Sequence, residues 1–169
     1  ATQNWTLFDM LVLSDALHYP DGLPGNEALK VAGCCTTPES LDSVIFIYLY
    51  GGSIVDDLEN PTRPTLDDQD TIEAVQWYSD LFNLHAVAPD PAFIRSAFPR
   101  GGLSEGIIRG YCGVWFGWYS NRGGLDTPAP WTVDWQMLPL PKNDAGFELG
   151  DVDGYYMTKD CAHPREVAQ

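Results

Sequence analysis

The chain has 169 residues, 44% of them hydrophobic and 20% charged, which is enough apolar material for the core of one domain. Nine basic against 24 acidic residues give a formal net charge of −15, and a surface of that sign repels phosphate backbones and anionic lipid headgroups. We therefore expect no nucleic-acid partner, and no apolar stretch reaches the roughly 18 residues that a membrane-spanning helix needs. The chain opens on Ala1 rather than Met, so we expect a processed or excised piece.

The cysteines and histidines do not have metal-site spacing. Cys34 and Cys35 are adjacent, Cys112 and Cys161 stand alone, and the three histidines are scattered along the chain. Zinc sites in proteins draw on closely spaced pairs of such ligands. We therefore predict no metal ion and no cofactor.

Two helices are expected in the first half of the chain, and a third segment could be either a helix or a strand. Residues 4–17 read as a helix with a capping box between Thr6 and Asp9, and with Phe8, Leu11 and Val12 on its apolar face. Residues 41–50 are almost wholly apolar and fit a buried helix or a strand equally well. A helix capped by Asp67 or Asp68 should run to about residue 84, with one apolar face. Its buried residues are expected to be Ile72, Val75 and Phe82.

Four short strands are expected, each separated from the next by turns or loops. Residues 29–34 could form one, residues 111–116 form a buried one, and residues 133–138 and 154–158 are further strands. Residues 95–102 read as an exposed loop, followed by a short helix over 104–109. Alternating helices and strands indicate an α/β fold, whose ligands gather near the strand ends.

Nucleophile elbows, Walker loops and dinucleotide fingerprints are missing from the sequence, so no enzyme signature is present. The unusual feature is aromatic, with 6 Trp, 8 Tyr and 7 Phe. Trp118 and Tyr119 follow a predicted strand and a glycine, where their rings could stack on the apolar face of a sugar. A structural role in a core or loop contact is an equally weighted interpretation of these two residues.

Several segments, in order along the chain, resemble the family 1 extracellular solute-binding proteins of ABC importers. They are residues 48–57 (YLYGGSIVDD), 64–68 (PTLDD), 72–78 (IEAVQWY), 87–89 (VAP), 112–117 (CGVWFG), 137–142 (MLPLPK) and 153–160 (DGYYMTKD), with His163-Pro164 after them. The resemblance covers nearly the whole chain. It implies one α/β lobe, residues 1–169, of a two-lobed fold of the periplasmic-binding-protein type II class, truncated at both ends relative to the family.

The resemblance also implies a set of ligand-binding residues. The segment before the apolar stretch of residues 41–50 maps to Glu39 and Ser40, and the loop after the CGVWFG segment maps to Trp118 and Tyr119. The family's glycine-rich turn before its last strand maps to residues 150–154, which places Asp151 and Asp153 near a ligand. The family's usual Gly-x-Trp is replaced here by Trp118-Tyr119-Ser120.

The function implied is capture of a small solute, expected to be a mono- or oligosaccharide, without catalysis. The partner would be the membrane permease of the importer, and the location periplasmic or extracellular, with a lipid anchor as an option for the full-length protein. A carbohydrate-active enzyme domain using Asp151 and Asp153 is the main alternative, and an isolated interaction domain is a third. An oligopeptide or polyamine ligand also stays open, because clefts of aromatic and acidic residues suit cations.

One disulfide prediction follows from the exported location. Oxidising compartments tolerate disulfides, and Cys112 and Cys161 could meet if their strands were antiparallel neighbours. We expect Cys34 and Cys35 to stay reduced, because adjacent cysteines pair only across a strained peptide.

Overall fold

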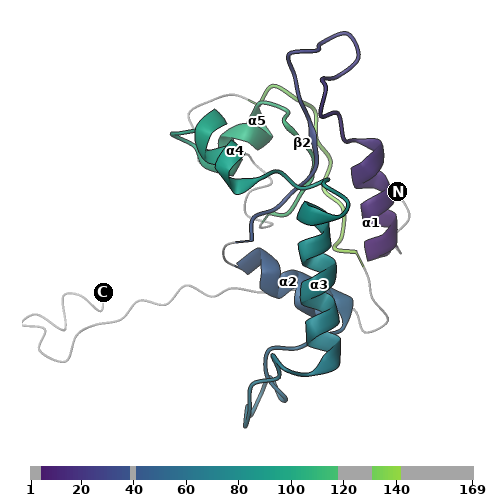
Figure 1. The fold of residues 1–169 in the computed structure, drawn as a ribbon, viewed down its shortest axis with the longest axis vertical. Helices are drawn as coiled ribbons and strands as arrows, with labels where there is room; N and C mark the ends of the chain where they lie inside the picture. Colours follow the sequence, from purple (N-terminus) through teal and green to yellow (C-terminus); the bar gives the residue numbers. More distant parts are fainter. Residues whose placement is uncertain (1–4, 39–40, 118–130, 142–169) are drawn as a thin grey trace, which may run out of the picture.

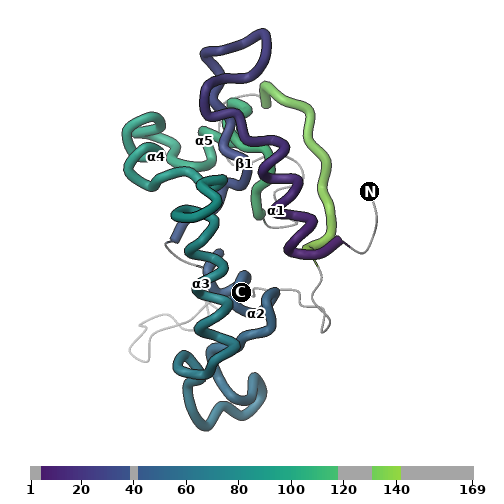
Figure 2. The backbone as a smooth tube through the Cα atoms, turned by 45° about the vertical axis from the view of Figure 1, so that its right-hand side comes forward, coloured from purple at the N-terminus to yellow at the C-terminus, as the bar shows by residue number. Residues whose placement is uncertain are grey.

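The computed structural model describes residues 5–38, 41–117 and 131–141. Their elements, in chain order, are α1 (Leu7–Ala16), β1 (Ala32–Cys35), α2 (Leu41–Tyr50), α3 (Gln69–Asn83), α4 (Pro91–Ala97), α5 (Gly102–Ile108) and β2 (Cys112–Trp115). The α/β class is confirmed at this level. Both views of the chain place α1 on one side of the strands and the α4–α5 pair on the other (Figures 1 and 2). No helix in the described ranges is long and apolar enough to cross a membrane.

The two strands pair in parallel, with Ala32 opposite Cys112 and Cys35 opposite Trp115. The predicted strand over 111–116 is confirmed, and the optional strand over 29–34 forms slightly later in the chain. Residues 133–138 form no strand, so that prediction is wrong. Their alternating pattern satisfies only the side-chain requirement of a strand, which also needs a neighbouring backbone to pair with. The predicted strand over 154–158 lies outside the described residues.

Helix α1 begins as predicted but buries a different face. The Thr6 hydroxyl accepts a hydrogen bond from the Asp9 amide at 3.2 Å, and the Asp9 carboxylate accepts one from the Thr6 amide at 2.8 Å. This confirms the capping box. The buried residues are Leu7, Met10 and Ser14, whereas Phe8 and Val12 are exposed. The face prediction was wrong because the strands lie on the Met10 side of the helix.

Residues 41–50 form a helix, which resolves the ambiguity in the sequence. Phe46 is fully buried and contacts Tyr78 of α3, with ring centroids 4.8 Å apart. The helix ends at Gly51, whose φ of 113° is the left-handed conformation that favours glycine. A side chain on the next residue, Gly52, would come within 2.9 Å of the Thr71 Cα, so this turn packs directly against α3.

The limits of α3 agree with the prediction, but its buried face does not. Thr71, Ala74, Tyr78 and Leu81 are buried, while Ile72 and Val75 are each 48% exposed and Phe82 is half-buried. One residue of offset turns a helix by about 100°, so the apolar stripe is rotated away from α2. The Thr71 hydroxyl donates a hydrogen bond to the Ser53 carbonyl oxygen at 2.7 Å, and this polar contact faces inward.

The segment after α3 is more helical than predicted. Residues 95–102 were expected to be an exposed loop, yet residues 95–97 complete α4 and Gly102 starts α5. The Asp90 carboxylate caps α4 by accepting a hydrogen bond from the Ala92 amide at 2.7 Å, and Pro91 occupies the first helical position. The short helix expected over 104–109 is confirmed.

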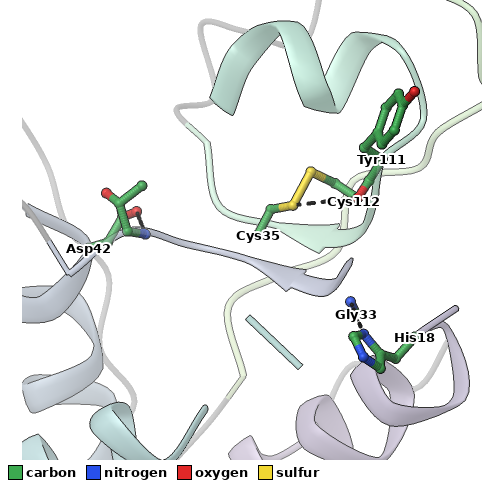
Figure 3. Close-up of a disulfide and its surroundings, with 7 residues drawn as sticks. His18, Gly33, Cys35, Asp42, Tyr111 and Cys112 are labelled. Atoms are coloured by element: carbon green, nitrogen blue, oxygen red, sulfur yellow. Dashed lines mark hydrogen bonds between the residues drawn. A yellow bond between two sulfur atoms is a disulfide. The ribbon is translucent and has the colours of Figure 1, made fainter. Parts of the chain in front are cut away.

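The disulfide lies in the sheet and has a different pairing from the predicted one. Cys35 and Cys112 are bonded, with Cα atoms 5.6 Å apart on adjacent strands (Figure 3). This corrects both the pairing of Cys112 with Cys161 and the expectation that Cys35 stays reduced. Cys34 is a buried free thiol, as expected. The prediction failed because it assumed an antiparallel neighbour for Cys112, whereas its described neighbour is the parallel strand β1.

Candidate functional site

A cavity of about 460 Å³ lies beside β2 and reaches the region beyond the carboxyl ends of both strands. Because β1 and β2 are parallel, those ends lie at the same edge of the sheet. This is where open α/β sheets place their ligands. We call this space the tryptophan cavity.

The tryptophan cavity is bounded by five parts of the chain in addition to β2. Its lining residues are Trp5; Leu13 of α1; Asp42 and Ile45 of α2; Leu103, Ser104 and Ile107 of α5; residues 113–117; and Trp131 with residues 135–141. Neighbouring side chains of a strand point to opposite faces, so contact with five consecutive residues places the cavity along the edge of β2.

Three tryptophans form a cluster on the cavity wall. The ring centroids of Trp115 and Trp131 are 6.1 Å apart with an interplanar angle of 29°, and those of Trp131 and Trp135 are 5.3 Å apart. Trp135 meets Trp115 edge-on at 6.5 Å. All three are half-buried, so they pack on one another while part of their surface stays accessible. Such faces suit the apolar face of a ring-shaped ligand.

The segment carrying Trp131 and Trp135 is held at both ends. The Thr132 amide and hydroxyl both donate to the Ile108 carbonyl oxygen, at 3.1 and 2.7 Å. At the other end, the Trp5 indole N–H donates to the Pro139 carbonyl oxygen at 2.8 Å. Figure 2 shows this segment running beside α1. It is therefore a wall of the cavity fixed to both α5 and the start of α1.

Asp42 supplies the one carboxylate among the described lining residues. Its Oδ2 atom accepts hydrogen bonds from the Thr36 hydroxyl at 3.2 Å and the Thr37 amide at 3.4 Å. The Thr36 hydroxyl also lies 2.9 Å from the Tyr78 hydroxyl. Asp42 is thus tied to the end of β1 and to α3, and Figure 3 shows it beyond the end of that strand. Burial raises the pKa of Asp42, and its two hydrogen bonds act in the opposite direction.

The described lining contains no Lys, Arg or His. Its other polar side chains are those of Ser104 and Gln136. Within the described ranges, no group of three His, Cys, Asp or Glu side chains is arranged to hold a metal ion. The cavity therefore combines indole rings, aliphatic surface and a single negative charge.

The six predicted site residues lie outside the residues whose side chains the structure describes. They are Glu39, Ser40, Trp118, Tyr119, Asp151 and Asp153. Four of these residues are close in sequence to residues that line the cavity. Glu39 and Ser40 shortly precede Asp42, and Trp118 and Tyr119 shortly follow Trp115. The sequence reasoning missed Trp131 and Trp135. Their spacing of four residues, next to a proline-rich stretch in a tryptophan-rich chain, was the available signal.

No protein-family model, curated protein or solved structure matches this chain.

Proposed function

We propose that the chain is an α/β lobe of the substrate-binding component of an ABC importer, which captures a small solute, a mono- or oligosaccharide, in a cleft between two lobes. The membrane permease would be its partner, and a periplasmic or extracellular space its location. Binding would occur by closure of the lobes, without chemistry.

The observation that carries this proposal is the tryptophan cavity, which follows the edge of β2 and extends past the carboxyl end of that strand. Sugar rings present apolar faces that stack on indoles, and their hydroxyl groups need carboxylate or amide partners. The Trp115–Trp131–Trp135 cluster offers the first, and Asp42 with Gln136 offers the second. The motif resemblance independently points to the same class of ligand.

The disulfide supports the proposed location. Disulfides persist in secreted and periplasmic proteins and are rare in the reducing cytosol. Cys35 and Cys112 are joined within the sheet of this chain, close to the proposed site.

A binding experiment tests the proposal directly. Tryptophan fluorescence and NMR titrations with a panel of mono- and oligosaccharides should show saturable binding. If the cleft is shared between two lobes, one lobe retains about half of the ~8 kcal/mol of a micromolar complex, which corresponds to millimolar affinity. Each sugar should therefore be titrated to a concentration of roughly tens of millimolar. Turnover of chromogenic glycosides in the same samples would instead favour the enzyme alternative.

Matched variants locate the site. Trp135→Leu should weaken sugar binding about tenfold, because it removes a stacking ring. Trp77→Leu removes a ring that packs on Phe46 and Tyr50 away from the cavity, and should leave the affinity unchanged. Trp118→Ala should also weaken binding, and that residue lies outside the described ones. Equal binding by wild type and Trp135→Leu would remove the tryptophan cavity from the proposal.

A further inference from the structure

We propose that the tryptophan cavity selects a solute carrying a protonated amine, with Asp42 binding the ammonium group and the tryptophan cluster contacting the ring or chain that bears it. This inference rests on the proposed function and narrows its substrate class. The ammonium group is the shared chemistry of two sources, an amino sugar and an aliphatic amine.

The described lining of the cavity contains a carboxylate but no cationic side chain. A carboxylate withdrawn from water is costly unless a positive charge or hydrogen-bond donors compensate it. Asp42 receives two donors, from Thr36 and Thr37, both on Oδ2. No Lys, Arg or His is among the described lining residues, so a cationic ligand would supply the missing charge.

The tryptophan cluster lines the same cavity as Asp42. Indole has the most favourable face for a cation among the aromatic side chains. Trp115, Trp131 and Trp135 present three indoles to the cavity that also contains Asp42. A neutral sugar would use the rings and hydrogen bonds from its hydroxyl groups, whereas an amine-bearing solute would add the attraction between its positive charge and Asp42.

The fold does not need the negative charge of Asp42. Burial raises the pKa of Asp42, which means that its ionised form is disfavoured at this position. An asparagine would keep an oxygen that accepts from Thr36 or Thr37. The net charge of −15 adds a long-range attraction for cations and a repulsion for anions.

Four probes separate the ammonium group from the rest of the ligand. Glucosamine carries both a sugar ring and an ammonium, glucose and N-acetylglucosamine carry the ring without the charge, and putrescine carries ammonium groups without the ring. Titrations monitored by tryptophan fluorescence and NMR, at neutral pH and low salt, should show glucosamine binding roughly tenfold or more tightly than glucose. Equal binding of glucosamine and glucose would overturn the inference and leave the proposed sugar-binding function standing.

Three variants assign the preference to Asp42. Asp42→Asn should remove the roughly tenfold preference for glucosamine over glucose, and Asp42→Glu, which keeps the charge, should retain it. Asp70→Asn is the matched control, because Asp70 also lies in the first turn of a helix but is exposed on α3. It should leave all four affinities unchanged. An unchanged preference in Asp42→Asn, with circular dichroism confirming the fold, would overturn the assignment.

The remaining outcomes separate the inference from the function on which it rests. Putrescine binding as tightly as glucosamine would support the ammonium site and overturn the carbohydrate part of the proposed function. If none of the four probes bound at concentrations of roughly tens of millimolar, both the amine-site inference and the proposed function would be overturned.

Discussion

The hydroxyl oxygens of Thr36 and Tyr78 lie 2.9 Å apart, although these residues are separated by 42 positions. This buried contact joins the end of β1 to the middle of α3. The Tyr78 hydroxyl donates its one proton to the Thr37 carbonyl oxygen and accepts from Thr36, whose own hydroxyl proton is shared between Tyr78 and Asp42. The Tyr78 phenol group thereby holds residues 36 and 37, which in turn hydrogen-bond to the carboxylate of Asp42.

Removing that phenol group should destabilise the protein measurably. Tyr78→Phe should lower the free energy of unfolding by about 1–2 kcal/mol, because buried polar atoms of Thr36 and Thr37 lose a partner. Denaturant unfolding measures this change. Tyr50→Phe is the control, since its ring packs on Trp77 and its hydroxyl makes no hydrogen bond within the described residues. Equal losses in the two variants would contradict a special role for the Tyr78 hydroxyl.

The disulfide should contribute more than any single hydrogen bond. Replacing Cys35 and Cys112 together by alanine should lower the free energy of unfolding by about 2–4 kcal/mol, because the bridge closes a loop of 77 residues in the unfolded chain. Thermal and denaturant unfolding measure the loss, and wild type treated with a reductant should behave like the double variant. Mass spectrometry of unreduced peptides should find Cys35 linked to Cys112. A peptide linking Cys112 to Cys161 would refute this pairing.

The buried thiol of Cys34 predicts an alkaline loss of stability. Burial raises the pKa of Cys34 from an ordinary 9.0 to about 12. Between these pH values the unfolded state releases the thiol proton and the folded state retains it, so the unfolded state binds fewer protons. The free energy of unfolding should therefore fall as the pH rises through this window, by up to about 1.4 kcal/mol per pH unit. Below pH 9 the contribution is fully present.

Cys34→Ala isolates this contribution from other groups that titrate at high pH. Its stability should be lower than that of wild type at pH 8, because a buried side chain is truncated, but should decline less steeply toward pH 11. Denaturant unfolding at four pH values gives both slopes. Parallel curves for the two proteins would show that Cys34 does not retain its proton.

Asp42 should destabilise the fold at neutral pH. Because burial raises its pKa above the ordinary 3.8, the folded state binds the proton more tightly than the unfolded state does. Stability is then lost as the pH rises from about 4 through the raised pKa. Asp42→Asn should therefore be at least as stable as wild type at pH 7, with its relative advantage disappearing below pH 4.

The exposed Asp70 again provides the comparison. Asp70→Asn should change the free energy of unfolding by no more than about 0.5 kcal/mol at either pH, because surface substitutions have small effects. Unfolding curves at pH 4 and pH 7 suffice for both variants. If Asp42→Asn proved clearly less stable than wild type at pH 7, Asp42 would have a structural rather than a ligand-binding role.

Local sequence determined where most helices begin and end. The capping box of Thr6 and Asp9 acts over three residues, so its geometry follows from the sequence itself. The end of α2 at Gly51 is local in the same sense, whereas the expected side-chain cap of α3 does not form, because the Asp68 carboxylate pairs with Arg63 instead. The strand over 112–115 could also be predicted from the sequence, because it is rich in β-branched and aromatic residues and is bounded by glycines.

Which face of each helix is buried was decided by the tertiary structure. Val75 and Phe8 are apolar and have helical spacing with other apolar residues, yet both are exposed. Thr71 and Ser14 are polar and buried instead. Periodicity identifies a helix, but the direction in which the helix faces depends on the neighbours that pack against it, and those neighbours are distant in sequence.

The sheet pairing and the candidate site depended on long-range contacts for the same reason. Cys35 meets Cys112 because two segments 77 residues apart form parallel strands, and spacing along the chain does not encode that pairing. Trp115 meets Trp131 and Trp135 because the later segment is anchored to Ile108 and Trp5. The sequence alone supplied the residue types of an aromatic, acidic site, and the tertiary structure decided which of them share one cavity.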